Sequence, residues 1–180
     1  MGRKKLIGYF ILLCFIGLIT SVFVYPIFHE CGHLIAALLT GGDVKHFTLY
    51  PFPSVLCFVN ANSLIKQVIV ALSGNLLPIA LSLMFTPRHF YFWYANLILR
   101  IVNIYCLLLD FLYMGLLFAS SPIQKNDITI ILSLAPGKTT IISILILYTL
   151  CLCLLFHKII KMSPVTTVLA HFDKIVKQET

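Results

Sequence analysis

The sequence predicts an all-α membrane protein with about four transmembrane helices, a short interfacial β-hairpin-like segment after the first and a C-terminal amphipathic helix. Of its 180 residues, 60% are hydrophobic and only 11% are charged. A soluble domain carries about 25% charged residues, and a globule of this size cannot hide so much apolar surface from water. A water-soluble domain and a disordered chain are therefore both excluded.

The first apolar run covers residues 6–39 and is longer than the roughly 20 helical residues that cross a bilayer. Because no polar loop interrupts the run, we expect one long helix that is kinked or restarted near Tyr25–Pro26. Three further spans are expected at about 64–85, 90–119 and 139–156.

A short pair of strands is expected between the first two spans. Residues 44–50 alternate loosely, 55–59 are β-branched and aromatic, and the prolines at 51–54 make a turn between them. A strand backbone cannot lie unpaired in lipid, so this segment must pack on protein or at the interface. The polar stretch 120–138 is expected to be a loop.

Basic residues gather near the two ends of the chain, whose formal net charge is +7. Ser163–Pro164 predicts the start of an amphipathic helix, so we expect a membrane-embedded core at 1–157 and a basic amphipathic tail at 158–180. This pattern is typical of contact with the lipid bilayer, and nucleic acid is not an expected partner. Four spans put both termini on one side of the cell membrane, and the basic ends predict the cytoplasmic side.

Residues 29–33 read His-Glu-Cys-Gly-His, an H-E-x-x-H motif in a helical segment. Side chains four residues apart share a helix face, so His29 and His33 can present two imidazoles to one zinc ion per chain, with Glu30 beside them as the general base. The alternative is a pair of core histidines that only form hydrogen bonds. An acid flanked by two histidines is costly in lipid and marks function, which favours the metal site.

A catalytic zinc needs a third protein ligand, and Asp110 is the predicted one because it is the only acid in the third span. Asn96, Asn103 and Asp110 are spaced by seven and predict a polar stripe that faces the interior of the bundle. Pairing of Asp110 with Arg100 is the alternative, but ten residues rise about 15 Å along a helix.

H-E-x-G-H in an early span, followed by a glycine-rich turn and short strands, resembles the site-2 protease family of intramembrane zinc metalloproteases, in a compact form without a PDZ domain. The family's later motif, N-x-x-P-x-x-x-D-G, supplies the third zinc ligand from its aspartate. Asn103 and Asp110 match that motif, whereas Cys106 replaces the proline and Phe111 replaces the glycine. The resemblance covers about residues 15–118.

The resemblance implies regulated intramembrane proteolysis, in which a metalloprotease hydrolyses a peptide bond in or next to a transmembrane segment of a membrane-anchored protein or peptide. Asn75 and Asn103 are the candidate substrate-binding residues, with a polar contact between helices as the alternative for Asn75. His29 lies about 35 Å along the helix from Leu6. The charge pattern therefore puts the histidines toward the outer leaflet, whereas the resemblance implies a site nearer the cytoplasm.

Two other function classes stay open. A catalytically inactive relative would bind metal or partner helices without cutting, and the altered second motif favours it. A haem-binding electron carrier would need axial histidines on facing helices, whereas His29 and His33 lie on one helix.

Overall fold

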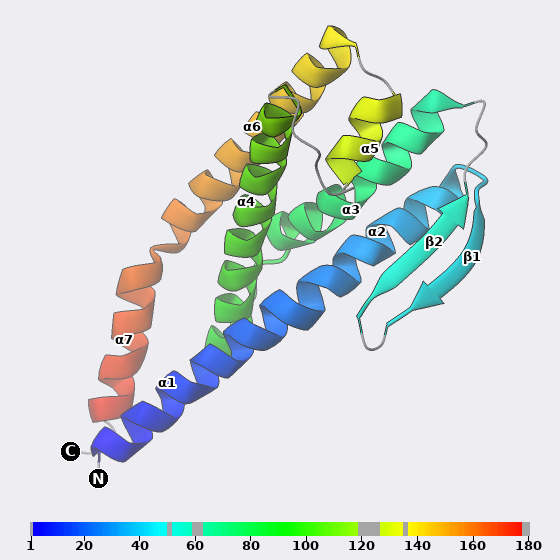
Figure 1. Cartoon of the computed structure of the whole chain (residues 1–180). Coiled ribbons are helices and arrows are strands. Elements are labelled where there is room, and N and C mark those ends of the chain that lie inside the picture. The colour runs from blue at the N-terminus through cyan, green and yellow to red at the C-terminus, as the bar shows by residue number, and fades with distance from the viewer. Residues whose placement is uncertain (1, 50–51, 59–62, 119–126, 135–136, 178–180) are drawn as a thin grey trace.

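A computed structural model describes residues 2–49, 52–58, 63–118, 127–134 and 137–177. It is helical except for one small antiparallel sheet, so the predicted all-α class with a short β-hairpin is confirmed (Figure 1). The two chain ends lie close together (Figure 1). The sheet lies at the other end of the long helical rod that residues 2–39 form (Figure 1).

The first apolar run forms one continuous rod made of α1 (Gly2–Ile19), a π-helical turn (Thr20–Val24) and α2 (Tyr25–Leu39). Pro26 is the second residue of α2, separated from the π-helical turn by Tyr25. Proline lacks an N–H group and its ring crowds the carbonyl four residues earlier, so a wider turn accommodates it. The predicted irregularity near Tyr25–Pro26 is confirmed.

The hairpin consists of β1 (Asp43–Thr48) and β2 (Ser54–Phe58), which pair antiparallel with a bulge between Val44 and His46. Gly41 joins α2 to the hairpin with a φ of 74°, a left-handed conformation that glycine adopts without strain. Of the two strands, β2 lies nearer α2 (Figure 1). The predicted strand pair is confirmed, although Tyr50 and Pro51 lie outside the described residues.

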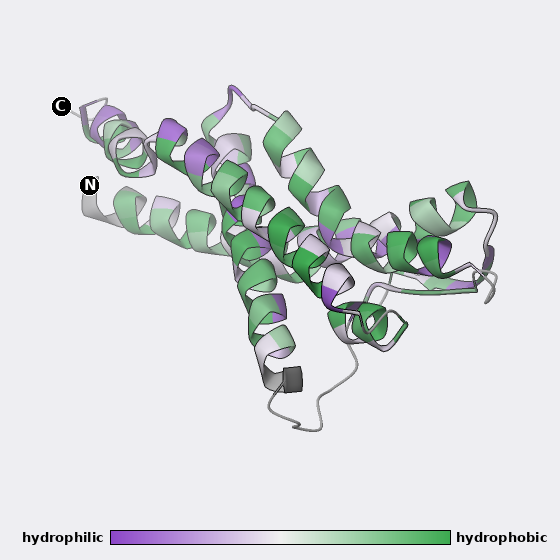
Figure 2. Cartoon of the chain, turned by 90° about the horizontal axis from the view of Figure 1, so that it is seen from above, coloured by the Kyte–Doolittle hydropathy of each residue, from purple (hydrophilic) through white to green (hydrophobic). Residues whose placement is uncertain are grey.

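Among the residues that the structure describes, four segments are long and apolar enough to cross a membrane. They are Leu6–Leu39, Leu64–Met84, Phe90–Gly115 and Lys138–Lys177, which include α3 (Leu64–Met84), most of α4 (Phe90–Phe118), α6 (Lys138–Met162) and α7 (Pro164–Lys177). Hydrophobic residues cover most of these helices (Figure 2). The last apolar segment is longer than the predicted span of 139–156, because α6 and α7 follow each other after a single residue.

The expectation of a loop over 120–138 was wrong for part of that stretch. Residues Asp127–Leu134 form the short helix α5, whose Ile128 and Ile131 are fully buried in the main apolar core. That core also contains Ile79 of α3, Leu107 of α4 and Tyr148 of α6. Burial of two isoleucines between three longer helices explains why so short a segment is helical.

The polar residues of α4 face the protein, as the stripe predicted, and several of them bind the end of α3. Arg100 is 2% exposed and donates two hydrogen bonds to the Ser82 carbonyl, at 3.0 and 2.8 Å. Asn96 donates to the Phe85 carbonyl at 2.8 Å. These donors satisfy carbonyls that the last turn of a helix leaves without partners, and the guanidinium charge suits that end of the helix dipole. The Arg100 guanidinium therefore binds the end of α3 and, in the described contacts, forms no ion pair with Asp110.

Helix α7 begins after Ser163, which has a φ of 43° and turns the chain away from the axis of α6. The predicted amphipathic helix is confirmed, and it contacts α1 and the start of α4. The proposed division into a core at 1–157 and a tail at 158–180 stays a prediction.

Candidate metal centre

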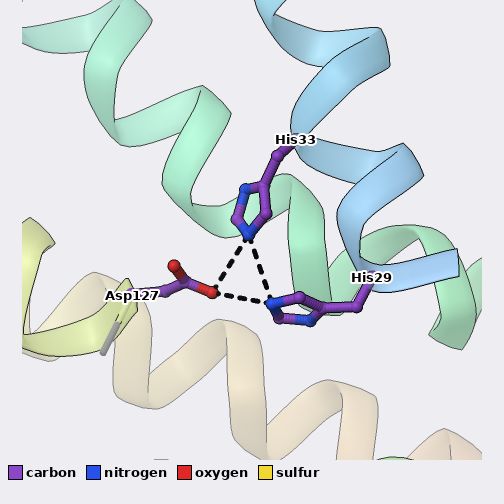
Figure 3. Close-up of side chains that lie close together, drawn as sticks. All are labelled: His29, His33 and Asp127. Carbon is purple, nitrogen blue, oxygen red and sulfur yellow. Dashed lines mark hydrogen bonds and ion pairs between the residues drawn. The ribbon is translucent and has the colours of Figure 1, made fainter. Parts of the chain in front are cut away.

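Three side chains from two helices converge on one point (Figure 3). His29 and His33 lie one turn apart on α2, and Asp127 is the first residue of α5. The Asp127 Oδ2 atom lies 3.1 Å from His29 Nε2 and 3.2 Å from His33 Nε2, and the two Nε2 atoms lie 3.2 Å apart. Among the described residues, these three side chains form the group able to hold a metal ion.

The donor types and spacings fit zinc. Imidazole nitrogen and carboxylate oxygen are both common zinc ligands, and ligand bonds of about 2.0–2.1 Å in a tetrahedron place neighbouring donors roughly 3.3 Å apart. The three measured separations lie within a few tenths of an ångström of that spacing. The three residues border cavities of about 510 and 340 Å³, which leave room for the fourth ligand that a catalytic site requires.

A second contact orients the His33 imidazole. Its Nδ1 atom lies 2.7 Å from the Val70 carbonyl oxygen of α3, which accepts a hydrogen bond when Nδ1 carries the proton. That tautomer leaves the Nε2 lone pair free to bind a metal. His29 Nδ1 is buried with no hydrogen-bond partner within the described residues, and the Tyr25 ring lies 5.9 Å from the His29 ring.

Two glycines let α2 and α3 approach closely at the site. A Cβ atom on Gly32 would overlap the Ser73 carbonyl oxygen, so this position of the H-E-x-x-H motif must lack a side chain. A Cβ atom on Gly74 would overlap His33 Nε2 and lie 2.8 Å from His29 Cε1. The space that holds the two imidazoles exists because residue 74 is glycine.

The Asp127 carboxyl is strongly biased toward its charged form. Burial by itself raises its pKa, but when the imidazoles of His29 and His33 are protonated, their hydrogen bonds and positive charge outweigh burial and hold that pKa well below its ordinary value. Asp127 is therefore a carboxylate at neutral pH, the form that a metal ligand requires.

Glu30 lies beside the group but is not part of it. Its Oε2 atom accepts a hydrogen bond of 2.9 Å from the Val55 N–H of β2. Glu30 and the three donor residues line a cavity of about 510 Å³ whose opposite wall includes β2. The carboxylate thus lies between the donor group and the strand.

Asp110, which the sequence predicts as the third ligand, is not in the donor group of the described residues. Its Oδ2 atom accepts a hydrogen bond of 2.7 Å from Asn75 Nδ2, and Asn75 Oδ1 accepts one of 3.2 Å from the Tyr25 hydroxyl. Here the structure places Asp127 where the sequence predicted Asp110. The ligand role of Asp110 stays a prediction, tested below against Asp127.

Asp110 and Asn75 nevertheless lie close to the metal centre. Both line a second cavity, of about 340 Å³, together with His29, Glu30 and Asp127. The donor group therefore has a cavity on each side, one facing β2 and one facing α4.

Asn103 and Asn96 lie among buried helix contacts. Asn103 is 1% exposed and donates to the Pro78 carbonyl at 3.2 Å, while Asn96 binds carbonyls at the end of α3. Neither side chain lines the two cavities of the metal centre. The substrate-binding role of Asn103 stays a prediction, and so does that of Asn75.

Sequence reasoning missed Asp127. One signal was present, because Asp127 directly precedes an apolar run and an acid in the first turn is typical of a helix start. Helix α5 is only eight residues long, Asp127 included, and follows a polar stretch, so the sequence pattern predicts a loop there.

Comparison of the chain with protein-family models, with curated proteins and with solved structures finds no match. The resemblance to the site-2 protease family therefore rests on the motifs of this sequence alone and stays a prediction.

Proposed function

We propose that this chain is an intramembrane zinc metallopeptidase of the site-2 protease type, a multi-pass protein of the cell membrane that hydrolyses a peptide bond in or next to a transmembrane segment of a membrane-bound substrate. The observation that carries the proposal is the convergence of His29, His33 and Asp127 with Glu30 at the wall of the same cavity. An acid next to an open three-ligand site is the arrangement that peptide hydrolysis by zinc requires.

His29, His33 and Asp127 would hold the zinc ion. When bound, zinc supplies Lewis-acid activation of water and of the peptide carbonyl. The Val70 carbonyl keeps the His33 ring in position. Asp127 adds a negative charge to two neutral imidazoles, which strengthens the binding of a divalent cation.

Glu30 is the proposed general base and then general acid. It follows His29 directly in the chain and accepts only the Val55 N–H in the contacts described, so a carboxylate oxygen is left to take a proton from water. Glu30 would then give that proton to the leaving amine. Because Glu30 takes up and then releases the same proton, these two steps need no second titratable residue.

The unpaired edge of β2 is the proposed substrate-binding element. Within the described sheet β2 pairs with β1 on one side only, and its Val55 N–H points to Glu30 on the other. Peptide bonds in a lipid-embedded helix are shielded by their own hydrogen bonds, so the substrate must first unwind. Pairing with β2 would hold the unwound segment extended across the cavity.

The test is Glu30→Gln in the purified chain and in cells that co-express single-span membrane proteins tagged at both ends. We expect Glu30→Gln to keep about one zinc per chain and to lose cleavage by at least roughly 100-fold, the usual contribution of a general base. Undiminished cleavage would remove Glu30 from the mechanism. Zinc in the wild type without cleavage of any tagged protein would instead favour the inactive relative.

A further inference from the structure

A pocket of about 520 Å³ lies between the start of α4 and α7. None of its described lining residues belongs to the candidate metal centre. Arg88, in the turn before α4, and Lys174, on α7, both line it, and both are exposed. Phe90 and Trp93 form its aromatic wall. Two cations 86 positions apart in the chain thus face one cavity.

The charged and hydrogen-bonding groups of this pocket suit an anion. No carboxylate is among its described lining residues. The N–H groups in the first turn of any helix have no intrahelical acceptor, and α4 begins at the pocket wall. Thr166 and Thr167 donate their hydroxyl protons to the Ser163 and Met162 carbonyls, so the charged donors left for an anion are Arg88 and Lys174.

Stacking of aromatic rings holds the two sides of the pocket together. The His171 ring stacks on Phe90 with centroids 3.6 Å apart and an angle of 10°, and it meets Tyr9 and Tyr91 edge-on. His171 and Lys174 are three residues apart and share a face of α7. The contact that fixes α7 on α4 therefore also brings Lys174 to the pocket that contains Arg88.

The pocket lies at the end of the molecule where a membrane surface is expected. The chain ends lie there, and α7 carries a concentration of hydrophilic residues beside them (Figure 2). Tyr91, Trp93 and Tyr94 surround the start of α4, and such residues are enriched at the level of lipid headgroups. The basic ends predict the cytoplasmic leaflet, whose anionic lipids attract lysine and arginine.

We infer that this pocket binds the phosphate group of an anionic phospholipid through Arg88 and Lys174. The inference rests on the proposed membrane placement and not on the metal centre. Failure of either one leaves the other unchanged, because zinc content and lipid binding are measured separately.

The test uses the purified full chain in a neutral detergent. Phosphatidylglycerol, phosphatidylcholine or inorganic phosphate is titrated in, and bound lipid is counted by native mass spectrometry while the midpoint of thermal unfolding is recorded. Arg88→Gln with Lys174→Gln removes the two pocket cations. Lys158→Gln with Lys161→Gln is the matched control, since it removes two charges at the end of α6 that do not line the pocket. All four side chains are exposed or half-buried, so these changes leave the core intact.

We expect saturable binding of phosphatidylglycerol, and not of phosphatidylcholine, to the wild type and the control variant. The pocket variant should bind phosphatidylglycerol roughly 30-fold more weakly. Equal binding by the pocket variant and the wild type would overturn the inference, as would an equal loss in both variants, which would indicate diffuse attraction. The inference would also be wrong if millimolar inorganic phosphate displaced phosphatidylglycerol and raised the midpoint of thermal unfolding as much as the lipid does. The pocket would then be a site for free phosphate.

Discussion

At the candidate metal centre, the absence of a side chain at Gly74 is as important for the site as the proposed ligands. Gly74 of α3 faces both imidazoles, and a methyl group there would occupy the space of His33 Nε2. His33 cannot simply rotate away, because its Nδ1 atom is bound to the Val70 carbonyl one turn earlier on the same helix. Helix α3 thus fixes the position of the His33 ring, the second proposed ligand, and leaves the space that this ring fills.

Gly74→Ala is therefore expected to weaken zinc binding at least about tenfold, the size of effect that loss of outer-shell support produces. The measurement is a competition titration with a zinc chelator. Gly115→Ala on α4 is the matched control, because no described atom from another element lies within 4 Å of the place its Cβ would take. Equal zinc affinity in both variants would show that the imidazoles do not need the space at residue 74.

At the scale of elements, a hydrogen bond of 2.9 Å joins β2 to Glu30, the proposed general base. The Val55 N–H donates to Glu30 and not to β1, so a proline at this position removes that bond while sparing the sheet ladder. A proline substitution at Val55 therefore tests the backbone of the strand edge, because it changes none of the side chains around it.

Val55→Pro is expected to keep zinc and to lower cleavage roughly tenfold or more, since it removes the contact that holds Glu30 in position. Val55→Ala keeps the N–H group and is the control, with cleavage near that of the wild type. If the two variants cleaved a tagged substrate at the same rate, the edge of β2 would have no part in the reaction.

The spans and the hairpin could be predicted because their signals are local. A continuous apolar run reports a membrane span, and the turn residues at 51–54 separate two β-prone segments. Helix α5 could not be predicted in this way, because Ile128 and Ile131 are buried only by contact with helices that are distant in the chain.

The sequence likewise predicts one part of the candidate site, the residues of α2, and not the third donor. His29, Glu30 and His33 belong to one helix turn, so their spacing alone predicts a shared face. The third donor joins them from another helix, and its identity depends on tertiary packing. A buried aspartate on a polar stripe was a reasonable choice from sequence, but Asn75 binds the Asp110 carboxylate in the structure.

At the scale of the whole molecule, the termini and the metal centre lie at different levels of the bundle. The first rod runs from the chain start to the hairpin, so the hairpin and α7 lie at opposite ends of it (Figure 1). Because the charge pattern predicts the basic ends on the cytoplasmic side, we expect the hairpin on the outer side.

Single cysteines at Ser163 and Ser54, in a chain whose own cysteines are replaced by serine or alanine, test this orientation. We expect a membrane-impermeant maleimide added to intact cells to label Ser54→Cys and to reach Ser163→Cys only after the membrane is opened. Labelling of both positions from the same side would contradict the arrangement of four spans.

The zinc content of two aspartate variants tests the donor group most directly. Asp127→Asn and Asp110→Asn each replace one carboxylate near the same two histidines by an amide of the same size, and zinc per chain is measured in both by elemental analysis beside the wild type. We predict about one zinc per chain in the wild type and in Asp110→Asn, and almost none in Asp127→Asn. Full zinc in Asp127→Asn, with loss in Asp110→Asn, would contradict the site described here.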